Sequence, residues 1–516
     1  MIKITIDGKT VNIEDGATLL DAARSAGIDI PTMCHRDKNV SPVSCFVCAV
    51  RVGGSDNFVP SCATKAIDGM VVYTSSDEVK ECRRRALELM LSEHAGDCAA
   101  PCSRICPCGL DIPEMMRRLL SGDINTAAET IMRSMPLPAT LGYICPAPCQ
   151  KGCRRTAVDT PLSIQLTHRA IAKSVINTSS HNKTIGTAQK FKNIAIIGSG
   201  PAGLSSAYFL TVNGYSCTIF ESQPAAGGTL RTQFDESALP KNILDAEIKL
   251  TEDLGVKFIL NKKINSIDEI YNDYDAVVIA TGHQENNQLR LFDLEQGSHG
   301  VKTCHDTLMT SRQKVFACGS AVRPVHMAAR SVGQGKLTAA SIDNYLSGKS
   351  AHKPFFMNIG HLSDAETESL VESIPYTDKS KTPLSIIDAI TDNPGRCLQC
   401  DCGKKNSCVL RDYAAQYGAH RLRYATGHRR QYIRQLYAGS GLVHEPGKCT
   451  VCGRCVNITR EKGIIPGLSF TGRGSSVYIS APFSADIDKA MGAVLDECVK
   501  SCPVGALWFK QNGGSA

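Results

Sequence analysis

The alternation of apolar and polar positions divides the chain into stretches with different predicted structure. Near the N-terminus, KITIDG and TVNIEDG alternate as strands do, and residues 19–26 are predicted to form a helix. Residues 79–175 read as mostly helical, whereas residues 192–350 show apolar strands, glycine turns and helices in succession. The polar, turn-rich residues 176–191 predict a linker between these two stretches.

Composition and charge narrow the class of protein. Apolar residues make up 42% of the chain and charged residues 21%, and no run of about eighteen apolar residues predicts a membrane span. The N-terminus lacks a basic-then-apolar signal pattern, so we expect a cytoplasmic protein. The net charge of +7 is modest, and nothing in the sequence favours nucleic-acid binding.

One local run is more basic than the rest of the chain. It contains His420, Arg421, Arg423, His428, Arg429, Arg430 and Arg434. Such a run is typical of a solvated helix face. It is also typical of a docking patch for an acidic electron carrier such as ferredoxin, or for a partner subunit.

The 24 cysteines indicate metal chemistry. In the absence of a secretion signal, disulfides are not expected, and most of the cysteines fall in tight groups, as metal ligands do. Zinc sites use compact paired ligands, while iron–sulfur sites often combine a close group with one distant cysteine that precedes a proline. Several groups in this chain have the second form.

The first group predicts a 2Fe–2S centre, with zinc as the alternative. Its members are Cys34, Cys45, Cys48 and Cys62. The surrounding segments, CHRDKNVSPVSCFVCAVRV and SCATKAIDGMVVYT, resemble the N-terminal ferredoxin module of the large iron–sulfur subunit of NADH–quinone oxidoreductase and of iron-only hydrogenases. The resemblance continues through VKECRRRALELMLSEHAGDC and implies a following 4Fe–4S site, bound by one histidine and three cysteines in a His-x3-Cys-x2-Cys-x5-Cys pattern.

From Cys98 onward the chain departs from that family. CAAPCSRICPCGLDIPEMMRRLLSGDINTAAETI, LGYICPAPCQKGCRR and PLSIQLTHRAI resemble the helical domain of the glutamate synthase small subunit, which dihydropyrimidine dehydrogenase shares. This resemblance implies two 4Fe–4S clusters. We expect one to be held by His94, Cys98, Cys102 and Cys153, and the other by Cys106, Cys145, Cys149 and His168. In a rival assignment Cys108 closes the first cluster, and in another interpretation the two histidines are ordinary side chains.

The segment NIAIIGSGPAGLSSAYFLTVNGYSCTIFES predicts a strand, a glycine turn, a helix and a second strand. Gly198, Gly200 and Gly203 form a G-x-G-x-x-G motif, and Glu221 ends the second strand. This pattern is typical of a dinucleotide-binding Rossmann fold, in which the glycines admit the pyrophosphate and the acid accepts hydrogen bonds from a ribose.

Three further segments, GGTLRT, AVVIATG and VFACGSAV, resemble the flavin contacts of the glutamate synthase small subunit. The implied FAD contacts are Gly198, Gly200, Pro201, Ala202, Gly203, Glu221, Gly228, Thr229, Arg231, Ala280, Thr281, Gly282, Gly319 and Ser320. Ser320 stands where that family usually has an aspartate for the ribityl chain. The roughly thirty residues after Gly282 are too few for the nicotinamide domain that the family inserts there. We therefore expect FAD, with NAD or an empty fold as alternatives.

Two cysteine groups lie near the C-terminus. Cys397, Cys400, Cys402 and Cys408 predict one centre, either 4Fe–4S or zinc. KCTVCGRCVNITREKG and SCPVGAL resemble a bacterial ferredoxin domain, with a 4Fe–4S cluster on Cys449, Cys452, Cys455 and Cys502. We expect no second cluster there, because Thr459 stands at a required cysteine position.

These features predict a multidomain α/β electron-transfer subunit with one 2Fe–2S centre, about four 4Fe–4S centres and FAD. The expected domains are a β-grasp 2Fe–2S ferredoxin (1–78), a helical double-cubane domain (79–175), a Rossmann-like FAD domain lacking the nicotinamide domain (192–350), a cysteine-rich connector (351–440) and a ferredoxin-like 4Fe–4S domain (441–516).

The combination resembles the iron–sulfur/flavin subunits of NAD(P)-linked complexes, including electron-bifurcating ones. The implied partners are flavin- or NAD(P)-binding subunits and subunits of the hydrogenase, formate dehydrogenase or transhydrogenase type. The alternatives are a stand-alone NAD(P)H oxidoreductase like the glutamate synthase small subunit, a non-catalytic metal-binding scaffold and a zinc-rich binding module.

Overall fold

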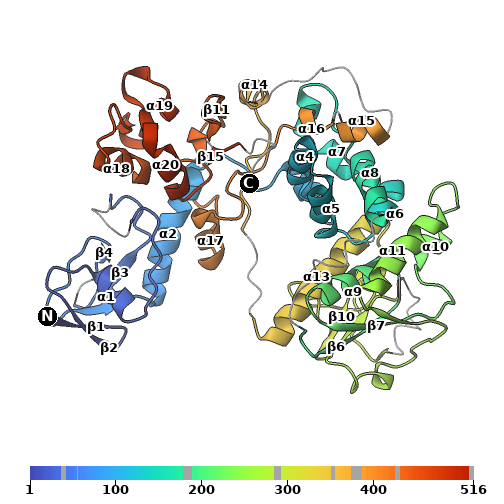
Figure 1. Cartoon of the computed structure of the whole chain (residues 1–516). Helices are drawn as coiled ribbons and strands as arrows, with labels where there is room; N and C mark the ends of the chain where they lie inside the picture. The colour runs from blue at the N-terminus through green and yellow to red at the C-terminus, as the bar shows by residue number, and fades with distance from the viewer. Residues whose placement is uncertain are drawn as a thin grey trace. The chain divides into compact units, whose positions relative to one another are not determined.

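A computed structural model shows two compact units (Figure 1). The structure describes residues 1–36, 42–54, 56–177, 189–283, 292–349, 355–373, 386–391, 393–424 and 430–510. The first unit combines Met1–Ala99, His352–Pro375 and Cys400–Asn512; the second combines Ala100–Ala351, Tyr376–Gln399 and Gly513–Ala516. The chain therefore leaves the first unit near residue 99 and returns to it near residue 352. It enters the second unit again near residue 376 and returns to the first near residue 400.

The N-terminal part of the first unit is a five-stranded sheet covered by helices. In chain order its elements are β1 (Ile2–Ile6), β2 (Lys9–Ile13), α1 (Leu19–Ser25), β3 (Ala49–Val52), β4 (Phe58–Pro60), β5 (Val71–Tyr73) and α2 (Asp77–Glu93). The strand order is β2-β1-β5-β3-β4, with β1 and β5 parallel. A capping box between Thr18 and Asp21 starts α1 where the sequence predicts a helix.

The C-terminal part of the first unit carries short elements around two apolar cores. They are α14 (Asp364–Glu372), α17 (Val409–Gln416), β11 (Gln435–Tyr437), β12 (Leu442–His444), α18 (Arg454–Glu461), β13 (Ser469–Thr471), β14 (Tyr478–Ser480), α19 (Ile487–Met491), α20 (Leu495–Ser501) and β15 (Leu507–Phe509). Strands β11, β12 and β15 form an antiparallel sheet. One of the two cores joins Leu87 and Leu91 of α2 to Leu410 of α17 and to Val504.

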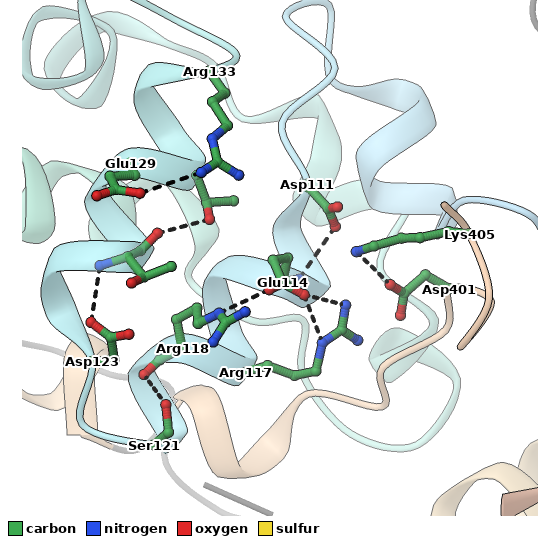
Figure 2. Close-up of polar contacts among 12 residues, drawn as sticks. Asp111, Glu114, Arg117, Arg118, Ser121, Asp123, Glu129, Arg133, Asp401 and Lys405 are labelled. Atoms are coloured by element: carbon green, nitrogen blue, oxygen red, sulfur yellow. Dashed lines mark hydrogen bonds and ion pairs between the residues drawn. The ribbon is translucent and has the colours of Figure 1, made fainter. Parts of the chain in front are cut away.

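The second unit begins with a group of helices, as the sequence predicts. They are α3 (Pro101–Ile105), α4 (Ile112–Leu120), α5 (Ile124–Met132), α6 (Pro138–Ile144), α7 (Pro148–Lys151) and α8 (Ile164–Asn177), with α15 (Ile386–Thr391) and α16 (Asn393–Arg396) added from later in the chain. Figure 2 shows how α4 and α5 are stabilised: Asp111 and Asp123 cap their N-termini, and Glu114 pairs with Arg117 and Arg118.

A parallel five-stranded sheet completes the second unit. Its elements are β6 (Asn193–Ile197), α9 (Pro201–Val212), β7 (Ser216–Phe220), α10 (Thr229–Thr232), α11 (Lys241–Asp253), β8 (Lys257–Ile259), β9 (Ala276–Ile279), β10 (Val315–Ala317) and α13 (Ala328–Ser347). The order is β10-β9-β6-β7-β8, with the apolar strands buried as expected for a doubly wound sheet. Among the described residues, no helix is long and apolar enough to cross a membrane.

Candidate metal and dinucleotide centres

The four cysteines of the N-terminal group lie together on the loops of the first sheet, and all are buried. The Sγ atoms of Cys48 and Cys62 are 3.4 Å apart. Hydrogen bonds from Cys45 and Cys62 lower the pKa of Cys34, and the bond to Cys34 raises the pKa of Cys45. Four thiols packed this closely fit a 2Fe–2S centre, in which four thiolates hold two irons.

The cysteine groups do not have the geometry of a site for one metal ion. Across the described part of the chain, no three His, Cys, Asp or Glu side chains are arranged to hold a single ion. An iron–sulfur cluster needs a different arrangement of its ligands, because each thiolate of a 4Fe–4S cubane binds a separate iron. Grouped thiols that do not converge on one point are compatible with such clusters.

In the second unit, one pocket brings together a group that the sequence predicts. Its lining includes the predicted ligands Cys106, Cys145, Cys149 and His168, and also Cys108, which the sequence assigned only as a rival ligand of the other cluster. The Nδ1 atom of His168 lies 3.2 Å from the carbonyl oxygen of Pro138, so Nδ1 carries the hydrogen and Nε2 keeps its lone pair. Burial lowers the pKa of His168 to about 4, which keeps the ring neutral near pH 7. A neutral imidazole oriented by a carbonyl is the usual form of a histidine ligand.

The residues predicted to bind the other middle cluster are divided between the two units. Cys102 and Cys153 belong to the second unit, whereas His94 and Cys98 belong to the first. Cys108 lies beside Cys106, and its thiol donates to the carbonyl oxygen of Ala329 at 3.2 Å.

The group at residues 397–408 is divided as well. Cys397 belongs to the second unit, where the Arg155 guanidinium donates to the carbonyl oxygen of Arg396 at 3.3 Å, two residues from Cys153. Cys400, Cys402 and Cys408 belong to the first unit. The expectation that all four hold one centre, of iron–sulfur or of zinc, stays a prediction.

The C-terminal ferredoxin-like group is brought together as its spacing predicts. Cys449, Cys452, Cys455 and Cys502 line one pocket in the first unit. Thr459 is buried and accepts a hydrogen bond from the backbone of Leu468 at 3.1 Å. Cys498 is fully buried, and its thiol contacts the carbonyl oxygen of Cys455 at 3.8 Å.

Gly198 and Gly200 of the glycine motif line a cavity of about 960 Å³, whereas Gly203 of the same motif does not. A Cβ atom on Gly203 would lie 2.0 Å from the carbonyl oxygen of Gly198, so only glycine allows helix α9 to start this close to the turn. The Glu221 carboxylate accepts from the backbone N–H and hydroxyl of Ser199, at 3.0 and 2.5 Å. These bonds fix the acid at the end of β7, beside the cavity.

The remaining predicted contacts also line this cavity. They are Gly198, Gly200, Pro201, Ala202, Gly228, Thr229, Arg231, Ala280, Thr281, Gly282, Gly319 and Ser320. The Ser320 hydroxyl, which stands in place of the aspartate expected from the resemblance, accepts from the backbone of Val325 at 3.2 Å. Lys262 and Lys263 add positive charge to the lining, which suits a ligand that carries phosphates.

The basic run is exposed only in part, because Arg423 is exposed whereas Arg434 is buried. Arg434 is only 4% exposed and pairs with the buried Glu445 at 3.2 Å. Arg423 pairs with Glu81 and Glu88, both at 3.3 Å, and Arg430 pairs with Glu93. Arg429 and His428 lie outside the described residues. Arg421 donates instead to the carbonyl oxygen of Asn358. Arg434 is therefore not part of a surface patch, and a docking role for the exposed part of the run stays a prediction.

Comparison with protein families agrees with three of these regions. Residues 1–77 match a 2Fe-2S iron-sulfur cluster binding domain, residues 73–180 match dihydropyrimidine dehydrogenase domain II with its 4Fe-4S cluster, and residues 196–254 match an NAD(P)-binding Rossmann-like domain. The chain is thus a multidomain α/β iron–sulfur protein with a dinucleotide-binding Rossmann-like domain.

Its relatives are subunits of redox enzymes. The chain is 34% identical over 225 residues to the beta subunit of the NADP(+)-dependent formate dehydrogenase of Moorella thermoacetica, which covers 39% of this chain and 32% of the relative. It is 31% identical over 206 residues to the beta subunit of the NADPH-Fe(3+) oxidoreductase of Geobacter sulfurreducens, covering 39% and 31%. It is 32% identical over 206 residues to the glutamate synthase [NADPH] small chain of Bacillus subtilis, covering 37% and 42%. The matches thus span less than half the length of each of these relatives.

Sequence reasoning missed a set of buried charged side chains in the first unit. Arg434, Glu445 and Lys448 are 4%, 0% and 1% exposed. Lys448 pairs with Glu445 at 2.7 Å, and the indole of Trp508 donates to the same carboxylate at 2.8 Å. No spacing rule marks these residues; the one available signal is that Lys448 directly precedes Cys449.

Proposed function

We propose that this chain is an electron-transfer subunit that relays electrons through 2Fe–2S, 4Fe–4S and FAD centres between partner subunits of an NAD(P)-linked redox complex. One observation carries the proposal. One apolar core of the first unit contains or contacts cysteines of four separate groups: Cys34 and Cys45, Cys98, Cys408, and Cys449, Cys452 and Cys502. Centres held by these cysteines would share one core, so we expect electrons to pass from one to the next.

The residues of this chain would hold and tune the centres. Buried thiols that supply four ligands suit iron and sulfide, and the surrounding apolar core excludes water from them. The second unit offers the pocket of Cys106, Cys145, Cys149 and His168, together with the dinucleotide cavity. When bound, FAD exchanges two electrons with a hydride donor and single electrons with clusters.

FAD is preferred to a nicotinamide nucleotide for this cavity. Iron–sulfur clusters accept one electron at a time, whereas a nicotinamide delivers a hydride, so a flavin is the usual link between them. The Rossmann-like match supports a dinucleotide of either kind. The formate dehydrogenase and NADPH-Fe(3+) oxidoreductase relatives support partners of the NAD(P)-linked type, such as a formate dehydrogenase subunit. Hydrogenase, transhydrogenase and ferredoxin partners are proposed from the sequence resemblance alone.

The test is anaerobic purification of the full chain with whatever co-purifies, followed by assays of iron, acid-labile sulfide, zinc and flavin. We expect about eighteen irons and one FAD per chain, with clusters that are reduced by dithionite. Zinc in place of iron, or clusters that resist reduction, would contradict an electron-transfer role.

A stand-alone NAD(P)H oxidoreductase is a second candidate, favoured by the Rossmann-like match and the glutamate synthase relative. Anaerobic addition of NADPH to the isolated chain separates the two. Bleaching of the flavin without any partner would favour the second candidate.

A further inference from the structure

We propose that His94, Cys98, Cys402 and Cys408 bind one 4Fe–4S cluster in the first unit, so that residues about 300 positions apart in sequence complete one site. The proposal rests on the iron–sulfur role proposed above and deepens it. It replaces two expectations from the sequence: that Cys98 shares a cluster with Cys102 and Cys153, and that Cys402 and Cys408 share one with Cys397.

Backbone contacts bring the segment of Cys98 to that of Cys402. The N–H of Cys402 donates to the carbonyl oxygen of Cys98 at 3.4 Å. On its other side, Cys98 donates from its N–H to the carbonyl oxygen of Met357 at 3.1 Å, and the N–H of Met357 reaches Cys98 Sγ at 3.3 Å. An N–H directed at sulfur is typical of cluster ligands, because it stabilises the thiolate.

The thiols of Cys98, Cys402 and Cys408 lie close enough to influence one another electrostatically. Cys402 lies near both Cys98 and Cys408, and Cys98 lies near Cys408. Cys98 also packs against the apolar core that contains Cys408, which is only 7% exposed. The chain after Cys408 is fixed in place by the N–H of Val409, which donates to the carbonyl oxygen of Pro503 at 2.9 Å.

Lys448 connects His94 to these thiols. A Cβ atom on Gly96 would lie 2.2 Å from Cε of Lys448, so the lysine stem packs against the turn between His94 and Cys98. A Cβ atom on Gly505 would lie 2.2 Å from Cys402 Sγ and 3.7 Å from Cδ of Lys448. The same lysine stem therefore lies beside the turn on one side and near the Cys402 sulfur on the other.

His94 has the burial and hydrogen bonding expected of a metal ligand. One ring nitrogen bonds to the backbone of Lys448, while Nδ1 is shielded from solvent and has no hydrogen-bond partner among the described residues. A buried polar atom without a partner is costly, and a metal bond would satisfy it. The ring thus supplies the fourth ligand beside the three thiols.

The division of the chain explains why the set is split in sequence. The second unit begins at Ala100, two residues after Cys98. The first unit resumes at His352 and, after Tyr376–Gln399 of the second unit, again at Cys400, two residues before Cys402. The second unit is thus inserted between two ligands of one site. Cys102, Cys153 and Cys397 remain in the second unit, available to a different centre.

The test compares Cys402→Ser and Cys408→Ser with Cys102→Ser and Cys153→Ser in the full anaerobic chain. We expect Cys402→Ser and Cys408→Ser each to lose about four irons per chain. Each should also lose the EPR signal of the reduced first-unit cluster that shows ¹⁴N hyperfine coupling to a histidine ligand. Cys102→Ser and Cys153→Ser should lose iron but keep that signal. Retention of the 2Fe–2S signal checks that the first unit is folded.

The nitrogen coupling is assigned with His94→Cys, which should keep the iron content but lose the coupling. The control Cys304→Ser, at an exposed cysteine outside all groups, should change neither. Persistence of the His94-dependent signal in Cys402→Ser and Cys408→Ser, or its loss in Cys102→Ser, would overturn the assignment alone. Wild-type protein without iron would instead overturn the electron-transfer function, and with it this assignment.

Discussion

The Nζ atom of Lys448 lies 2.7 Å from Oε2 of Glu445, and both side chains are withdrawn from solvent. Glu445 also pairs with Arg434 and accepts from Trp508, so one carboxylate joins two buried cations and the indole. Lys448 and Arg434 lower the pKa of Glu445 to about 2 against the opposing effect of burial. The carboxylate is therefore ionised throughout the neutral range, and the charges depend on one another.

Replacing Lys448 by methionine should strongly destabilise the first unit. Removing one partner of a buried ion pair leaves an uncompensated charge and typically costs about 3–5 kcal/mol. Urea unfolding can be followed by the fluorescence of Trp508, which is the one tryptophan in the chain and contacts Glu445 directly. The matched control is Lys80→Met, because Lys80 forms an exposed pair with Asp77 at 3.3 Å and should matter little. Equal shifts of the urea midpoint in both variants would contradict the prediction.

Glu247 should make the second unit less stable as the pH rises. Its carboxylate accepts from the backbone N–H groups of Ala139 and Thr140 at 2.6 and 2.8 Å, yet burial raises its pKa from 4.5 to about 7. Between these values the folded chain binds a proton that the unfolded chain has lost, so stability falls as the pH rises from about 4.5 through 7.

The measurement is the thermal midpoint of wild type and Glu247→Gln between pH 5 and pH 8. The glutamine cannot ionise, so the part of the pH dependence that comes from this side chain, on the order of 3 kcal/mol, should disappear. Parallel pH profiles for the two proteins would show that Glu247 does not titrate in this range.

Two glycines of the nucleotide loop should respond differently to alanine. At Gly203 the added Cβ would lie 2.0 Å from the Gly198 carbonyl oxygen, so Gly203→Ala should disrupt the strand–helix turn and lower thermal stability. At Gly200 a Cβ meets no protein atom within 4 Å, but it would occupy the space where a pyrophosphate approaches the loop. Gly200→Ala should keep the stability of the ligand-free chain and lose bound flavin. The thermal midpoint of flavin-free protein measures the change in stability, and the flavin released on denaturation measures the loss of binding. Unchanged flavin content in Gly200→Ala would contradict the assignment of this cavity as the flavin site.

Substitution of Cys455 and of Cys498 should distinguish a cluster ligand from a buried core cysteine. Cys455 lines the pocket with the other three cysteines of its group, whereas Cys498 is fully buried and contacts the Cys455 carbonyl oxygen. Cys455→Ser should lose about four irons per chain, while Cys498→Ser should keep them. Iron and sulfide assays on anaerobic protein decide; loss of iron in both variants would mean that Cys498 is also a ligand.

The sequence alone determined those parts of the protein in which neighbours in sequence are neighbours in space. The strand-like segments before residue 19, the helix that Thr18 caps and the glycine turn at Gly198 were all predicted, because periodicity and turn chemistry act within a few residues. The grouping of Cys449, Cys452 and Cys455 follows from the same short range.

Only the tertiary structure decided which distant residues meet. Cys98 and Cys402 contact each other although most of the chain between them forms the second unit, and cysteine spacing carries no information about such an insertion. Arg434 was expected in a surface patch because its neighbours in sequence are basic, yet Glu445 and the aromatic ring of Trp508 enclose it in the core. Burial of a charge depends on a partner supplied by another strand, and such a partner cannot be recognised from the local pattern.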